Sequence, residues 1–349
     1  MADYKKHLIV NSSNVKHALE KLNILGYDGI LFVVDDEERL VGSLTDGDIR
    51  RGLLNGLGLE NNVLDFIQKH PRFLRKGNYS IHEVIDYRKN GFRIIPMVDN
   101  ENRIVNVVNF RFHKSCIPMD VIIMAGGRGE RLKPLTDNTP KPLLMVGDKP
   151  IIEHNIDQLI SYGVNDIWVS VRYLGEQIEE YFKNGSDKGV NIRYLREDSP
   201  LGTIGAAAKA EITQQQYVLV INADILTNIN FEDFFLDFIS KDVMLSVVTI
   251  PYYVNIPYAV LETNNEDVIS FKEKPVYTYF SNGGIYLMKT ECLKLIPPNT
   301  LFNTTDLMEL LIANNQKVVS YQMRDYWLDI GKHEDYKKAQ EDIKHIKFS

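Results

Sequence analysis

Four almost wholly apolar runs limit what the C-terminal two thirds of this chain can fold into. They are Val121–Met124, Ile167–Val171, Tyr217–Ile221 and Met244–Ile250. Continuous apolar runs that alternate with helical patterns are typical of parallel strands covered on both faces. The sequence therefore predicts an α/β domain built on a mostly parallel sheet. Ligands of such sheets bind at the carboxyl ends of the strands, which is where a site is expected.

Composition excludes several other classes of protein. The chain has 349 residues, 44% of them apolar and 25% charged, with a net charge of −7. No apolar window approaches the roughly 18 residues of a membrane span, and the N-terminus has no signal-peptide core. Two cysteines, Cys116 and Cys292, are too few for a disulfide framework. We therefore expect a soluble, cytoplasmic protein with no membrane partner. The absence of a basic stripe argues against a nucleic-acid partner.

The N-terminal third repeats itself. Val34–Gly42 and Val98–Asn106 share five identities at a constant offset of 64 residues. Each copy is predicted as helix, strand, turn, strand and a second helix or helix stub, and two such small copies should pack on each other. The stretch 110–119 is predicted to be a linker. The expected domains are residues 1–115, with copies at about 1–62 and 63–115, and residues 119–349.

The repeated unit resembles a tandem pair of cystathionine-β-synthase (CBS) modules, an α+β fold. The residues that carry the resemblance are Leu31–Asp36 and Arg39–Arg50. In that family the equivalents of Thr45 and Asp48 can hold the phosphate and ribose of a regulatory nucleotide, as their hydrogen-bonding groups allow. The second copy has Phe112 in place of Asp48, so at most one such site is expected. The alternative is that Thr45 and Asp48 only cap the helix that follows.

A glycine-rich string follows the first strand of the larger domain. Its residues, 125–142, read AGGRGERLKPLTDNTPKP. It is neither a Walker A loop nor a dinucleotide fingerprint, because the required Lys-Ser/Thr pair and third glycine are missing. Three glycines within four residues still let backbone N–H groups approach a phosphate. Arg131 and Lys141 could clamp a polyphosphate from opposite sides.

This string resembles the signature loop of sugar-1-phosphate nucleotidyltransferases. Further landmarks of that family follow in order: Pro200–Ala206, Asn222–Asp224, Phe271–Pro275, Ser281–Tyr286 and Trp327–Gly331. The resemblance implies a Rossmann-like, GT-A-like fold. It also implies attack of a sugar 1-phosphate oxygen on the α-phosphorus of a nucleoside triphosphate, which releases pyrophosphate. Such chemistry depends on positioning and charge neutralisation.

The resemblance also implies roles for particular residues. Mg²⁺ would be held by Asp224 and Asp329, with Arg131, Lys141 and Asp224 as the catalytic group. Two further sets would bind substrate. The nucleotide set is Ala125, Gly126, Gly127, Gly129, Gly202 and Thr203, and the sugar-phosphate set is Glu273, Lys274 and Asn282.

Substrate identity stays open at this point. The Met124–Gly127 opening together with a CBS pair is similar to guanylyltransferases of surface-glycan synthesis, including the glucosamine-1-phosphate enzyme of the legionaminic acid route, so GTP is favoured. The alternatives are a cytidylyl-, uridylyl- or thymidylyltransferase, or a catalytically silent nucleotide-binding protein. A phosphocholine cytidylyltransferase would need an aromatic cage, for which Tyr252, Tyr253, Tyr277, Tyr279 and Phe280 are candidates. CBS pairs commonly dimerise, so we expect a homo-oligomer.

Overall fold

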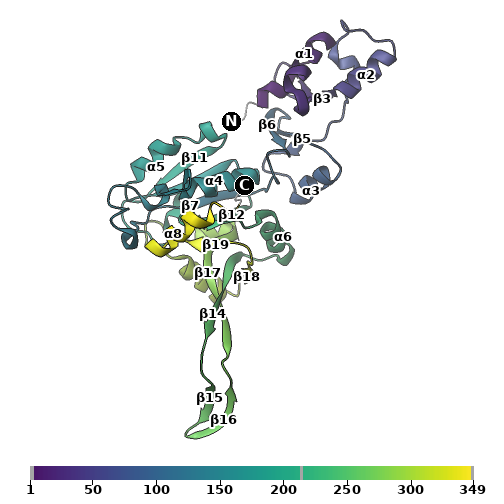
Figure 1. The fold of residues 1–349 in the computed structure, drawn as a ribbon. Helices are drawn as coiled ribbons and strands as arrows, with labels where there is room; N and C mark the ends of the chain where they lie inside the picture. The colour runs from purple at the N-terminus through teal and green to yellow at the C-terminus, as the bar shows by residue number, and fades with distance from the viewer. Residues whose placement is uncertain (1–3, 213–214, 347–349) are drawn as a thin grey trace.

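A computed structural model describes residues 4–212 and 215–346 (Figure 1). It consists of an N-terminal part with two small sheets, a larger α/β part, and a long two-stranded arm that projects from the larger part. The ends of both expected domains, residues 1–3 and 347–349, lie outside the described residues.

The N-terminal part contains the same arrangement twice. In each copy a short strand pairs in parallel with a second strand, which pairs antiparallel with a third. The predicted repeat unit begins with a helix, so it does not include the short first strand of each copy. The elements are β1 (Leu8–Val10), α1 (Val15–Leu25), β2 (Ile30–Val34), β3 (Leu40–Thr45) and α2 (Asp46–Leu54), then β4 (Leu74–Arg75), α3 (Ile81–Lys89), β5 (Ile94–Val98) and β6 (Ile104–Asn109).

The two copies contact each other through equivalent residues. The Leu40 N–H donates to the Asn102 carbonyl over 2.9 Å, and the Ile104 N–H donates to the Glu38 carbonyl over 3.1 Å. Each donor and each acceptor is separated from its counterpart by the same 64 residues as in the sequence repeat. The sequence repeat is therefore a structural repeat related by a local two-fold.

The larger part is built on a seven-stranded sheet in the order β11-β10-β7-β12-β17-β14-β18. Its strands are β7 (Asp120–Met124), β10 (Asp166–Val171), β11 (Asn191–Arg196), β12 (Tyr217–Asn222), β14 (Leu245–Asn255), β17 (Val276–Lys289) and β18 (Val318–Gln322). Only β17 runs antiparallel to its neighbours in this sheet. The predicted mostly parallel α/β sheet is confirmed.

Helices and short pairs of strands complete this part. Helix α4 begins at Ile151, and Pro150, whose ring fixes φ, stands at its N-cap. The phenylalanines of α6 point into the core. The remaining elements are α4 (Ile151–Ser161), α5 (Gly175–Phe182), α6 (Phe231–Lys241), α7 (Thr304–Ala313), α8 (His333–Asp342), β8 (Met145–Val146), β9 (Lys149–Pro150), β13 (Ile225–Thr227) and β19 (Trp327–Asp329).

The second half of the predicted linker, residues 115–119, is buried, whereas residues 110–114 are partly or fully exposed. Cys116 and Ile117 are 0% and 2% exposed, and they belong to one apolar core that joins the second copy to the larger sheet. An ion pair of 2.6 Å between Arg88 of α3 and Glu232 of α6 spans the same junction. The first copy has a core of its own. The second copy is therefore packed onto the larger part and is not separated from it by an exposed hinge.

The arm extends two strands of the sheet far beyond it. Strand β14 was predicted to end at Ile250, but it runs on to Asn255 while pairing with β17. A terminal hairpin, β15 (Val260–Asn264) and β16 (Asp267–Lys272), forms the tip. Strands β12 and β14 both pair antiparallel with β17, so they run in the same direction. The arm, which continues β14, therefore leaves the sheet at the edge where β12 ends.

A buried carboxyl at the start of β7 yields a prediction of pH dependence. Asp120 is 8% exposed, and burial, followed by the neighbouring Asp166 carboxylate, raises the pKa of its carboxyl to about 7. A pKa raised by folding means that the native state binds the proton more tightly. Stability is therefore lost as the pH rises from the unfolded-state pKa to about 7.

Asp120→Asn removes this loss. We expect its melting temperature to exceed that of the natural protein by about 2–4 °C near pH 8, and by clearly less near pH 5.5. The matched control is Asp36→Asn, because Asp36 is exposed. It should leave the difference in melting temperature between pH 5.5 and pH 8 as it is in the natural protein. A pH-independent effect of Asp120→Asn would contradict the assignment.

Candidate active site

The glycine-rich loop starts at the carboxyl end of β7. A Cβ on Gly126 would lie 2.7 Å from a Glu197 carboxylate oxygen, so this position has no room for a side chain. Gly129 has φ +63°, and a Cβ there would lie 3.0 Å from the Lys141 Cβ. The Thr136 hydroxyl donates to the Gly129 carbonyl over 2.9 Å and fixes the turn. These contacts explain why glycine stands at both positions.

A cleft of about 330 Å³ opens between the ends of β7 and β12. The structure brings most of the predicted nucleotide and catalytic residues into its wall. Those that line it are Ala125, Gly126, Gly127, Lys141, Gly202, Thr203 and Asp224. The glycine-rich residues and Asp224 follow the carboxyl ends of β7 and β12, as the strand-end rule predicts, whereas Lys141, Gly202 and Thr203 come from longer loops.

Lys141 lies between the two predicted metal ligands. Its ammonium contacts the Asp224 carboxylate and lies 3.8 Å from Oδ1 of Asp329. The Ile330 N–H donates to the Asp224 carbonyl over 3.0 Å, and Ile225 pairs with Asp329, so backbone bonds hold the two carboxylates side by side. One cation thus faces two anions at the mouth of the cleft.

The carboxyl of Asp329 is incompletely satisfied. Its Oδ1 is buried without a hydrogen-bond partner among the described residues, because 3.8 Å from Lys141 is too long for one. Burial, and next the Asp224 charge, raises the pKa of this carboxyl, while Lys141 and Arg131 oppose the shift. Two adjacent hard oxygen donors with a spare lone pair fit a divalent cation. No group of three or more His, Cys, Asp or Glu suited to a metal occurs among residues 4–212 and 215–346, so other ligands would come from phosphate or water.

The segment at Gly202 and Thr203 is anchored to the start of α7. Gly202 has φ +80°, and a Cβ there would lie 2.6 Å from the Phe302 carbonyl oxygen. The Asn303 side chain accepts from the Thr203 N–H over 3.2 Å, and the Thr203 hydroxyl accepts from the Thr304 N–H over 2.9 Å. These bonds fix the segment as one wall of the cleft.

Two residues in the cleft wall were missed by sequence reasoning. Arg172 lines the cleft and donates from Nε to the Gly126 carbonyl over 3.3 Å. Glu197 is buried, accepts from the Ser170 hydroxyl, and accepts from the Leu201 N–H over 3.2 Å. Each directly follows the end of a sheet strand, so the strand-end rule would have found both.

Two other predicted residues border the cleft region. The guanidinium nitrogens of Arg131 would lie 3.4–3.5 Å from a Cβ on Gly331, close to Asp329 in sequence. The Asn282 side chain accepts from the Gly284 N–H over 2.9 Å, and Gly284 in turn packs against Asn222. Both residues are therefore near the Asp224–Asp329 pair, although neither lines the cleft itself.

The structure does not bring Glu273 and Lys274 to the cleft. Both lie on the arm, between β16 and β17, and are exposed. Lys274 has a φ of +42°, which is unusual for a residue with a side chain. The five aromatic residues considered for a cage are also on the arm, where neighbours such as Tyr252 and Tyr253 point to opposite faces. The register places Tyr252, Tyr277 and Tyr279 on one face of the ribbon, and Tyr253 and Phe280 on the other.

In the first copy, Thr45 and Asp48 cap helix α2. The Asp48 carboxylate accepts from the Thr45 N–H over 2.9 Å and from its hydroxyl over 2.6 Å, and its other oxygen contacts Arg51 and Gln68. Burial tends to raise the pKa of Asp48, but these hydrogen bonds outweigh it, and the pKa is lowered. The capping role considered from the sequence is thus present. A ribose would have to replace some of these partners.

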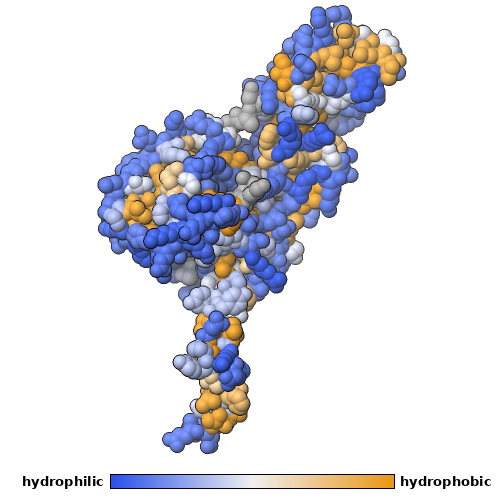
Figure 2. Space-filling model, in the orientation of Figure 1, coloured by the Kyte–Doolittle hydropathy of each residue, from blue (hydrophilic) through white to orange (hydrophobic). Residues whose placement is uncertain are grey.

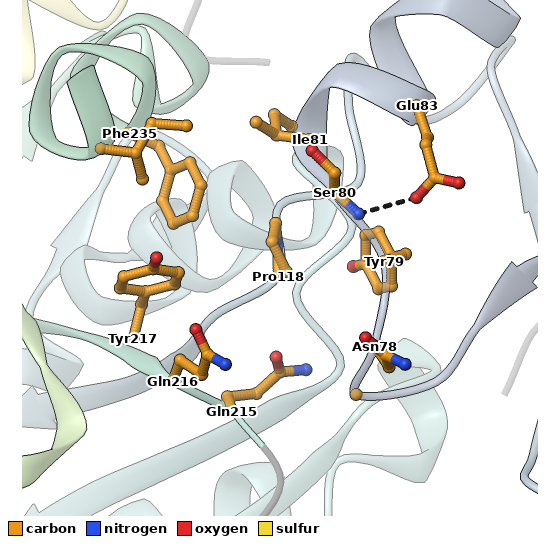
Figure 3. Close-up of a pocket in the computed structure, with 12 residues that line it drawn as sticks. Asn78, Tyr79, Ser80, Ile81, Glu83, Pro118, Gln215, Gln216, Tyr217 and Phe235 are labelled. Atoms are coloured by element: carbon orange, nitrogen blue, oxygen red, sulfur yellow. Dashed lines mark hydrogen bonds between the residues drawn. The ribbon is translucent and has the colours of Figure 1, made fainter.

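Another cavity, of about 400 Å³, lies at the junction of the second copy and the larger part. Figure 3 shows Tyr79 and Ser80 on one side, Tyr217 and Phe235 on the other, and Pro118 between them. Its described lining includes no lysine or arginine and none of the predicted site residues. A polyphosphate would find no counter-charge there, so the smaller cleft is the better candidate for the nucleotide.

Comparison with known proteins gives two family matches. The model for nucleotidyl transferases matches residues 120–346, and the model for CBS domains matches residues 9–55. The first match takes in the whole cleft. None of the helices in the described parts of the chain is both long and apolar enough to cross a membrane.

Individual relatives match the same region. The chain is 32% identical over 227 residues to a mannose-1-phosphate guanyltransferase of Schizosaccharomyces pombe, with 62% of each chain covered. It is 31% identical to a D-glycero-alpha-D-manno-heptose 1-phosphate guanylyltransferase of Aneurinibacillus thermoaerophilus, covering 65% of this chain and 99% of that one. HddC from Yersinia pseudotuberculosis, solved with GMP-PN, matches with a TM-score of 0.51 and 25% identity over 64% of this chain and 99% of that one. The chain thus spans less than two thirds of the Schizosaccharomyces relative.

Proposed function

The chain belongs to the nucleotidyl transferase family, and on that premise we propose that it transfers a nucleoside monophosphate from a nucleoside triphosphate to a sugar 1-phosphate. Those two substrates fit the family. The observation that carries the proposal is the Lys141 ammonium set between Asp224 and Asp329 in the wall of a glycine-lined cleft.

In the proposed reaction an oxygen of the sugar phosphate attacks the α-phosphorus of the triphosphate. The bond from that phosphorus to the bridging oxygen of the β-phosphate breaks, and pyrophosphate leaves. Lys141 would hold the α-phosphate, and Arg131 would bind the leaving group. The backbone of Gly126 and Gly127 allows the nucleotide to approach without steric hindrance. No covalent nucleophile is needed.

The family generally uses a divalent metal ion, and we propose Mg²⁺. Asp224 and Asp329 would hold it, since carboxylates and phosphate oxygens are its preferred ligands. When bound, it would neutralise charge on the reacting phosphates. Lys141 would then be released from its ion pair with Asp224 and become available to substrate.

GTP is the proposed nucleotide. The guanylyltransferase relatives and the GMP-PN complex support this choice, while a uridylyltransferase of Synechocystis is 28% identical to this chain. An assay of pyrophosphate release distinguishes guanylyl from uridylyl transfer. Each of GTP, dTTP, UTP, CTP and ATP is tested with the 1-phosphates of mannose, heptose, glucosamine and glucose, and with phosphocholine. We expect release with GTP and one sugar phosphate. Release with another nucleotide alone would overturn the choice of base. Because both proposed substrates are cytoplasmic metabolites, we expect a cytoplasmic enzyme.

We also propose that residues 1–115 form a tandem CBS pair, with copies at 1–62 and 63–115, attached to the transferase domain 119–349. The family match to residues 9–55 and the local two-fold between the copies support this division. A regulatory adenine or guanine nucleotide would bind at Thr45 and Asp48 and change the transferase activity.

Regulatory binding is testable in the full chain, whose second copy shares a core with the transferase domain. We expect calorimetry with AMP to show one site that Thr45→Ala weakens by at least about tenfold, since the hydroxyl would bond a phosphate oxygen. The matched control is Ser80→Ala. It removes a capping box of the same kind from α3 and should leave AMP binding unchanged. Repeating the titrations with GMP tests the other base. Equal effects of the two variants, or no binding, would contradict the proposal.

A further inference from the structure

The arm, residues 250–281, is the least protected apolar part of the molecule. Ten of its large apolar side chains are 50–76% exposed. They are Tyr252, Tyr253, Tyr258, Leu261, Val268, Ile269, Phe271, Val276, Tyr279 and Phe280. Figure 2 shows orange, hydrophobic patches between paler and blue residues along the projecting arm. Scattered apolar residues are normal on a surface, but a concentration of this kind marks an interaction site.

The arm has no core that could support it alone. It is a two-stranded ribbon from the pair Ile250 and Ser281 outward, and isolated ribbons of two strands are marginally stable in water. Its apolar residues lie on both faces, since Val268 and Ile269 are adjacent in β16. A partner that covers the arm must therefore contact both faces of it.

The position of Glu273 and Lys274 indicates what that partner is. The base of the arm borders the cleft, because the Trp327 indole donates to the Gly283 carbonyl over 2.8 Å and Gly284 packs against Asn222. From Gly283 back to Val276 the chain is a strand, and a rise of about 3.3 Å per residue places Val276, two residues from Lys274, roughly 23 Å out along the arm. Each chain's cleft therefore lacks the cation that its own arm carries outward.

We infer that the arm of one copy inserts beside the cleft of a second copy and supplies Glu273 and Lys274 to its sugar-phosphate site. Because the arm leaves the sheet at the edge where the cleft opens, two copies facing each other across a two-fold axis can exchange arms reciprocally. The inference rests on the proposed function and on the family resemblance, which implies that Glu273 and Lys274 bind the sugar phosphate.

The exposed apolar area is sufficient for such an exchange. At roughly 100 Å² for each of the ten side chains, one arm would bury on the order of 1,000 Å², and two arms about twice that. Stable protein interfaces bury about 1,200–2,000 Å² in total. A second copy also explains why the ribbon stays extended and does not fold onto its own cleft.

Mixed dimers test the exchange. Lys274→Ala and Asp224→Asn, each alone, should have little activity. Co-expressed with different tags and purified as mixed dimers, they should regain about half of the natural rate, because one of two sites is then complete. Mixed dimers as inactive as their parents would overturn the exchange, and so would full activity of Lys274→Ala alone.

A cross-link tests the contact even if the proposed reaction fails. Benzoylphenylalanine in place of Tyr279 should give a covalent product of two chains on illumination, whereas the same residue in place of Tyr181, which is exposed on α5, should not. Chain-to-chain product with an inactive natural protein would refute the proposed function and keep the arm contact. Only single chains at both positions would overturn the contact itself.

Discussion

Asp224→Asn is expected to lower kcat by at least about 10²–10³-fold while the protein stays folded. The amide cannot supply the negative charge that Lys141 contacts or that a metal ion requires. The backbone bond from the Ile330 N–H to the Asp224 carbonyl is unaffected, so the junction of β13 and β19 should persist. Steady-state rates and circular dichroism measure the two effects.

The chain offers a matched control for this substitution. Asp237 pairs with Lys241 on α6, and its side chain is 28% exposed, as is that of Asp224. Asp237→Asn should therefore change the local charge equally and leave kcat near the natural value. Near-normal turnover of Asp224→Asn with Mg²⁺ would defeat the assignment of the catalytic centre.

Lys141→Met is expected to have the second large effect. The Lys141 side chain is 10% exposed, and methionine retains most of its volume without the charge. We expect kcat to fall by at least about 10²-fold, because the α-phosphate loses its cation. Two facing carboxylates would also lose their shared partner, so the variant should be less stable in the absence of metal and partly rescued by Mg²⁺.

Lys241→Met is the corresponding control on α6 and should affect neither rate nor metal dependence. The double variant Lys141→Met/Asp224→Asn shows whether the two residues act together or independently. If the two residues act as a unit, the double variant should be about as slow as the slower single variant. Fully multiplicative losses would show that they act independently.

The sheet could be predicted because its strands are buried on both faces. Runs such as Val121–Met124 and Tyr217–Ile221 have no polar interruption, and all four predicted runs form strands of one sheet. The repeat was also visible, because Asp35 and Asp99 have the same role in the two turns: each carboxylate accepts from the backbone N–H groups two and four residues later. Glu38 and Asn102, the equivalent residues of the two turns, both have positive φ values near +60°.

The cleft was predicted from chemistry more than from pattern. Glycines and cations in the loop pointed to a phosphate site, whereas Arg172 and Glu197 stand alone after their strands and belong to no motif. The strand-end rule marks both as candidates, and the structure adds that the glycine-rich loop packs against them. Gly126, for example, is required by the Glu197 carboxylate, which is distant in sequence.

The arm and the junction could not be predicted, for a common physical reason. Both depend on which part of the protein packs against a given apolar segment, and the sequence does not specify that packing. Cys116 and Ile117 looked like part of a linker and are core residues. Tyr252 and Tyr279 looked like ligand contacts and are a cross-strand pair on an exposed ribbon.

The central claim is transfer of the nucleoside monophosphate group, which contains the α-phosphate. Nucleotide that carries a phosphate label tests this claim most directly. The full chain would be incubated with Mg²⁺, the sugar 1-phosphate selected by the pyrophosphate screen, and GTP labelled at either the α- or the γ-phosphate. The account predicts that the α-label appears in a nucleoside diphosphate sugar and the γ-label in pyrophosphate, in equal amounts. Release of the γ-label as orthophosphate, with the α-label left in GDP, would contradict it and would indicate a nucleoside triphosphatase.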